Sequence, residues 1–63
     1  MAEKLIRYYK YIKEVQGFEG QFKLAQATKM PSTIAALEPD SPENIKHFRE
    51  AIRLLTGKDA PVY

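Results

Sequence analysis

The chain has 63 residues, of which 44% are hydrophobic and 29% charged, with a formal net charge of +2. This composition is typical of a globular domain, and so short a chain leaves no room for a deep catalytic cavity beside its core. The longest apolar run, Ile34 to Leu37, is too short for a transmembrane helix, and the N-terminus lacks the apolar segment of a signal peptide. The absence of cysteine excludes disulfides and thiolate metal sites. We therefore expect a small cytoplasmic domain stabilised by packing alone, with no cofactor.

The first predicted helix covers residues 2–16. Its apolar residues recur at spacings of three, four and three, which is typical of one buried helix face: Leu5, Tyr8, Ile12 and Val15. Gly17 predicts the end of this helix and the start of a short turn, because glycine is favoured just after a helix C-terminus. We expect Phe18, in that turn, to fold back into the core.

Two short helices are predicted next, over residues 21–28 and 32–37. Phe22 and Ala25 continue the apolar face, and Leu24 broadens it. Pro31 must interrupt the first of these helices or begin the second, because proline cannot donate a backbone hydrogen bond. Ser32 or Thr33 can cap the second helix, and the proline-containing link over residues 38–42 ends it.

The last predicted helix, over residues 42–56, has the clearest boundaries. Ser41 is an expected N-cap, Pro42 suits the first helical position, and Gly57 closes the helix. The prediction is an all-α domain over residues 1–57, in which two long amphipathic helices flank a short pair, followed by a C-terminal tail over residues 58–63. Its predicted core consists of Leu5, Tyr8, Ile12, Val15, Phe18, Phe22, Leu24, Ala25, Ile34, Leu37, Ile45, Phe48, Ile52 and Leu55.

Catalytic chemistry finds little support in this chain. Acid–base or nucleophilic catalysis needs polar groups that converge, whereas the carboxylates here are scattered and His47 is the only histidine. His47 shares a helix face with Glu43, but a metal site needs three or four ligands and no further ligand-rich spacing exists. Capping explains Ser32, Thr33 and Ser41 without a nucleophilic role. We expect no catalytic residue, no metal site and no small-molecule substrate.

Positive charge is concentrated in the first part of the chain. Residues 1–37 carry six basic groups and three acids, a local charge of +3, whereas residues 38–63 carry a local charge of −1. Four of the basic groups form one predicted face of the first helix: Lys4, Arg7, Lys10 and Lys13. This face could contact phosphates, with Tyr11 beside it, or could be a solvated surface. Membrane binding is disfavoured, because the apolar face of the same helix is needed against the last helix.

Residues 20–38 contain an ordered set of motifs. Gln21 stands three residues before the pair Leu24-Ala25, a turn follows, and then come the run Ser32-Thr33-Ile34 and Glu38. This pattern resembles the lambda-repressor and Cro-like helix-turn-helix family, and the segment Pro42 to Gly57 matches a later helix of that family.

The resemblance implies a small DNA-binding transcription regulator that acts on duplex DNA as a dimer. In that family the first short helix contacts the DNA backbone and the second enters the major groove. Transferred to this sequence, Gln21 would touch a phosphate, and Lys23 would be available to the backbone. The groove-facing candidates would be Lys29, Ser32 and Thr33.

An alternative interpretation is a helical protein–protein interaction module or a small accessory subunit without DNA binding. The predicted recognition segment offers Ala35 and Ala36 where side chains that read bases are usual. A homodimer or another protein partner could also cover Tyr11, Val62 and Tyr63. A near-perpendicular crossing of the two short helices, with the start of the second exposed, would favour DNA binding. An antiparallel arrangement or a buried start would favour the interaction module.

Overall fold

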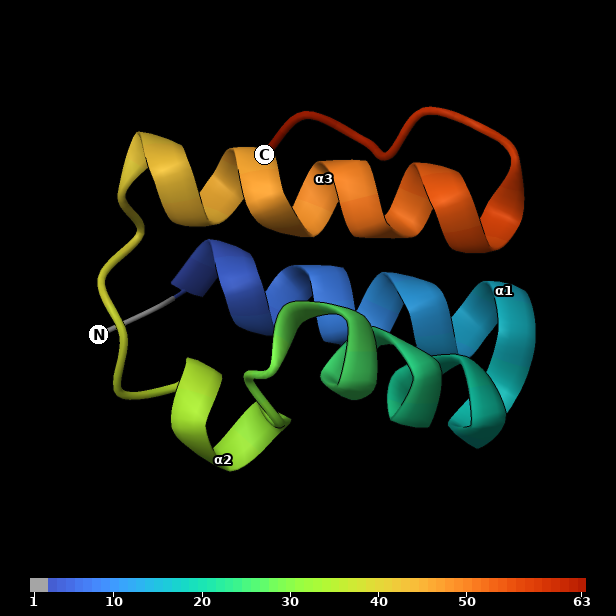
Figure 1. Cartoon of the computed structure of the whole chain (residues 1–63), viewed down its shortest axis with the longest axis horizontal. Coiled ribbons are helices and arrows are strands. Elements are labelled where there is room, and N and C mark those ends of the chain that lie inside the picture. Colours follow the sequence, from blue (N-terminus) through green and yellow to red (C-terminus); the bar gives the residue numbers. More distant parts are fainter. Residues whose placement is uncertain (1–2) are drawn as a thin grey trace.

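The computed structural model describes residues 3–63 and contains three helices, with no strand in this part of the chain (Figure 1). They are α1 (Glu3–Thr28), α2 (Ser32–Ala35) and α3 (Pro42–Thr56). The all-α expectation is confirmed, but the expectation of four helices is wrong. The predicted helices over residues 2–16 and 21–28 are the two arms of α1, and the predicted start at residue 2 lies outside the described residues.

Helix α1 bends sharply at Gly17. This glycine has φ 72° and ψ −162°, a backbone conformation open essentially to glycine alone. Helical structure continues on both sides, so we call residues 3–16 the N-terminal arm and residues 18–28 the C-terminal arm. Figure 1 shows the C-terminal arm returning alongside the N-terminal arm. The predicted turn through residue 20 is replaced by a reversal at one residue, which adds about a turn of helix to the C-terminal arm.

Gly20 allows the two arms to pack closely. A β-carbon on this buried residue would lie 2.6 Å from Cβ of Gln16 and 3.1 Å from both the carbonyl oxygen and Cγ1 of Ile12. Two side-chain hydrogen bonds then join the arms and the turn after them. Gln21 Nε2 donates to the Tyr9 carbonyl oxygen at 3.0 Å, and the Tyr9 hydroxyl donates to the Met30 carbonyl oxygen.

Helix α3 has the predicted bounds. The Ser41 hydroxyl accepts from the Asn44 N–H at 3.1 Å, Pro42 occupies the first turn, and Gly57 ends the helix with a positive φ of 75°. The helix runs in the same direction as the N-terminal arm (Figure 1). Gln16 Nε2 donates to the Leu55 carbonyl oxygen at 2.8 Å, which joins the C-terminal ends of both.

Asp40 caps α1 from a distant part of the chain. Its two carboxylate oxygens accept from the backbone N–H groups of Lys4 and Leu5, at 3.0 and 3.3 Å. These donors belong to the first helical turn, where no intrahelical acceptor exists and negative charge is stabilising. The link before α3 therefore fixes the start of α1 as well as the start of α3.

Helix α2 is a single turn, shorter than the predicted helix over residues 32–37. The Pro31 carbonyl oxygen accepts from the N–H groups of Ile34 and Ala35, and α2 has no side-chain cap. The prediction that Ser32 or Thr33 caps this helix is therefore wrong. Pro31 itself takes the N-cap position, which leaves both hydroxyl side chains in solvent.

The core lies between the N-terminal arm, α3 and the inner face of the C-terminal arm. The Phe48 ring is fully buried, with its centroid 5.8 Å from that of Tyr9 and 6.5 Å from that of Tyr8. The buried apolar residues of the described chain are Leu5, Tyr8, Tyr9, Ile12, Leu24, Ala35, Phe48, Ala51, Ile52 and Ala60. Five predicted core residues are exposed instead, and for these the prediction is wrong: Val15, Phe18, Phe22, Ile34 and Leu37. Periodicity identifies apolar faces but does not say which of them is covered.

The C-terminal tail over residues 58–63 packs against the helices and turns back along α3 (Figure 1). Ala60 is buried, and the Tyr8 hydroxyl donates to the Pro61 carbonyl oxygen at 2.9 Å. The Tyr63 ring lies 5.0 Å from the Tyr8 ring, centroid to centroid. The tail therefore closes one side of the core.

Candidate interaction surface

The C-terminal arm of α1 has two opposite faces. At about 100° per residue, Gly20, Leu24 and Thr28 fall on one face and Phe18 and Phe22 on the other. The first three residues are buried, whereas Phe18 is 72% and Phe22 64% exposed. The arm thus packs its smaller residues inward and leaves two large aromatic side chains in solvent.

Charged side chains surround these two rings. The Lys13 ammonium lies 4.5 Å from the centroid of the Phe18 ring, a cation–π contact. Lys23 Nζ lies 3.5 Å from Glu19 Oε1, one helical turn earlier. Lys29 is exposed and directly follows Thr28, the last residue of the arm. We call this set the phenylalanine surface; its members are Lys13, Phe18, Glu19, Phe22, Lys23 and Lys29.

The residues predicted to contact DNA do not all face one way. The Gln21 side chain is turned toward the N-terminal arm, where its amide donates to the Tyr9 carbonyl oxygen. Lys23 is exposed and pairs with Glu19. Lys29, Ser32 and Thr33 are exposed around the turn between α1 and α2, and Lys29 has a positive φ of 59°. Lys29, directly after α1, and Ser32 and Thr33, at the start of α2, are therefore exposed, whereas the Gln21 amide is engaged inside the protein.

The basic face predicted on the first helix is partly occupied by aromatic contacts. The Arg7 guanidinium lies 5.1 Å above the Tyr63 ring, and Lys13 covers Phe18. Lys10 is exposed, and Lys4 is half-buried beside its backbone contact with Asp40. Only part of this face is free to meet an anionic partner.

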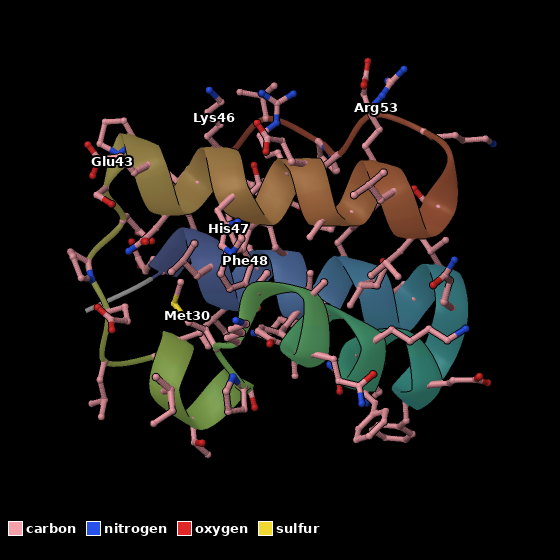
Figure 2. All side chains as sticks on the ribbon, viewed as in Figure 1. Met30, Glu43, Lys46, His47, Phe48 and Arg53 are labelled. Carbon is pink, nitrogen blue, oxygen red and sulfur yellow. The ribbon has the colours of Figure 1, made fainter. Side chains whose placement is uncertain are left out.

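His47 lies at the junction of α3 and the end of α1, where Figure 2 shows it on the side of α3 that faces the C-terminal arm. Its Nε2 is 3.3 Å from the Thr28 carbonyl oxygen. Among residues 3–63, no group of three or more histidine or carboxylate side chains could hold a metal ion. None of the helices in this range is long and apolar enough to cross a membrane.

No protein-family model, curated protein or solved structure matches this chain. Sequence reasoning missed the phenylalanine surface because it assigned both rings to the core. The spacing of Gly20, Leu24 and Thr28, one small or apolar residue per helical turn, is the signal that could have indicated the inner face.

Proposed function

We propose that the protein is a non-catalytic helical protein–protein interaction module whose phenylalanine surface docks an acidic amphipathic helix of a partner. The observation that carries this proposal is the exposure of Phe18 and Phe22, one helical turn apart on a well-packed arm. Large exposed apolar side chains that lie together mark interaction sites in soluble proteins. Apolar side chains spaced by one turn are also the anchors that a helix offers to an apolar partner surface, such as the apolar face of a second helix.

The charge around the rings favours an acidic partner. The phenylalanine surface carries three lysines and one glutamate, and that glutamate already pairs with Lys23. Carboxylates of a partner helix would therefore meet Lys13 and Lys29. A second copy of the chain fits less well, because a two-fold contact places the same lysine-rich patch on both sides.

DNA binding is the second candidate. It is favoured by the exposure of Lys29, directly after α1, and of Ser32 and Thr33, at the start of α2. It ranks second because α2 is a single turn and because Gln21 is engaged inside the protein. Few side chains of such a turn can reach base edges in a major groove.

Two synthetic helical peptides test the proposal. Both have the same apolar face, and their other positions are glutamate in one and lysine in the other. In a fluorescence-anisotropy titration we expect the glutamate peptide to bind in the micromolar range, and to bind more weakly as salt is raised. Replacing both rings (Phe18→Ser, Phe22→Ser) should weaken binding by about tenfold or more, as loss of aromatic anchors does. Leu37→Ser, which changes an equally exposed side chain outside the surface, is the matched control.

Three results would overturn this assignment. The first is equal affinity for the two peptides, or an equal loss in the Leu37→Ser variant. The second is a dimer in sedimentation that the double serine variant abolishes, which would make a second copy the occupant. The third is binding of duplex DNA at about 50 mM salt that falls steeply by about 200 mM and weakens in Lys29→Glu, which would favour the helix-turn-helix interpretation.

A further inference from the structure

An open groove of about 430 Å³ lies on the outer side of α3, between this helix and the C-terminal tail. Figure 2 shows Lys46 and Arg53 on this outer side, pointing away from α1, whereas Phe48 points toward α1. None of the groove residues belongs to the phenylalanine surface. The lining consists of Pro42, Ile45, Lys46, Arg49, Glu50, Arg53, Asp59 and Ala60.

The groove combines an apolar part with an excess of positive charge. Pro42, Ile45 and Ala60 supply the apolar part, and the charged lining has three cations and two carboxylates. Both carboxylates are already paired, since Lys46 Nζ lies 3.9 Å from Glu50 Oε1 and Arg53 contacts Asp59. The lining therefore has one cation in excess.

That excess cation is Arg49. In the described chain no carboxylate lies within ion-pairing distance of its guanidinium, and its only protein acceptor is the Ala60 carbonyl oxygen, 3.5 Å from Nη2. Its Nε is shielded from solvent and has no hydrogen-bond partner. Buried polar groups are nearly always hydrogen-bonded, and an unpaired one is costly, more so when it is charged. The Arg49 guanidinium is therefore under-satisfied, and Arg49 is one of the residues that line the groove.

We propose that this groove binds a small organic anion: a carboxylate or sulfonate carried on a flat apolar body. The oxyanion pairs with the Arg49 guanidinium, whose planar fork matches two oxygens of one anionic group. The apolar body lies against Pro42 and Ile45. The volume of the groove is in the range of small-ligand sites, and one excess positive charge suits a single negative charge. This ligand is bound without chemical change.

A matched pair of ligands tests the proposal in the unmodified protein. 1-Naphthoate carries the anion, whereas 1-naphthamide has the same apolar body without charge. In a ¹H–¹⁵N correlation titration we expect 1-naphthoate to shift the amide signals of Ile45, Arg49 and Ala60, and to bind about tenfold more tightly than 1-naphthamide, as a charge-assisted hydrogen bond predicts. Arg49→Gln should remove this preference. Lys46→Gln, which removes a cation already paired with Glu50, should keep it.

Equal binding of the two ligands, or shifts confined to the phenylalanine surface, would overturn the proposal. So would a preference for 1-naphthoate that survives in Arg49→Gln. The ligand comparison needs no substitution, so the proposal stays testable even if Arg49→Gln fails to fold. Its failure would also be distinct from failure of the proposed protein docking, because the peptide titration probes α1 and this titration probes α3 and the tail.

Discussion

The reversal of direction within α1 depends on the backbone conformation of Gly17. Its φ of 72° and ψ of −162° lie in a region that side chains with a β-carbon avoid. A β-carbon placed there would meet no atom within 4 Å, so steric crowding by neighbouring residues is not the reason for glycine at this position. The requirement is one of backbone conformation alone, and it allows α1 to reverse within one residue.

We predict that Gly17→Ala lowers the free energy of unfolding by about 1–3 kcal/mol, the usual cost of such a backbone conformation. Urea unfolding followed by circular dichroism measures the change. Gln26→Ala, at an exposed position of the C-terminal arm, is the control and should stay within about 0.5 kcal/mol of the parent. An unchanged midpoint for Gly17→Ala would mean that the chain turns in another way.

At the scale of the element, the C-terminal arm shows why aromatic character is a poor guide to burial. Gly20 lies on its inner face against Gln16 and Ile12, where a β-carbon would come within 2.6 Å of Gln16 Cβ, so a residue without a side chain is needed for this approach of the two arms. Leu24 and Thr28 then follow on the inner face, and the Thr28 hydroxyl donates to the Leu24 carbonyl oxygen at 2.8 Å. The larger rings of Phe18 and Phe22 are left on the outer face.

This arrangement predicts effects of very different size for two substitutions on one arm. Leu24→Ala should lower the free energy of unfolding by about 2–5 kcal/mol, because it opens a cavity beside fully buried neighbours. Phe22→Ser removes a larger side chain but should change stability by no more than about 0.5 kcal/mol, because that ring is largely in solvent. Thermal or urea unfolding of both variants measures the contrast. A larger loss in Phe22→Ser would show that the ring is buried in solution.

At the scale of the whole molecule, two tyrosines connect the N-terminal arm to distant parts of the chain. The Tyr8 hydroxyl reaches the tail at Pro61, and the Tyr9 hydroxyl reaches the turn at Met30. Burial raises the pKa of Tyr8 above its ordinary value of 10.0, although the Arg49 charge acts in the opposite direction. Burial also raises the pKa of Tyr9, although the neighbouring Thr28 side chain acts in the opposite direction.

We predict that stability declines as the pH rises through 10. Tyrosines of the unfolded chain lose their protons near pH 10, whereas folded Tyr8 and Tyr9 keep theirs, so alkali favours the unfolded state. Urea unfolding between about pH 8 and 11 measures the slope. Replacing both residues by phenylalanine should reduce that slope. Absorbance at 295 nm provides a second readout, and a tyrosine titration curve of the folded protein identical to that of the unfolded chain would contradict the prediction.

Local signals in the sequence were sufficient for part of the fold. The bounds of α3 follow from Ser41, Pro42 and Gly57, and the helical class follows from apolar periodicity. Each of these signals acts within a few residues, through a cap or a helical turn, so no other part of the chain is needed to interpret it. The lysines of the phenylalanine surface could likewise be located as a basic region from the sequence alone.

Tertiary structure alone decided which apolar faces are covered and which residues far apart in the sequence contact one another. Residues 18–28 offer two faces, and the one that packs against the N-terminal arm, with Gly20 beside Gln16 and Ile12, is the buried one. The cap that Asp40 provides for α1 and the contact between Pro61 and Tyr8 join residues more than thirty positions apart. Periodicity carries no information about such partners, because a helix face has the same pattern whether a neighbour covers it or solvent does. The protein-docking proposal depends on the exposed phenylalanine rings, and the anion-binding proposal depends on the under-satisfied Arg49. Both features result from tertiary packing and could not be predicted from the sequence.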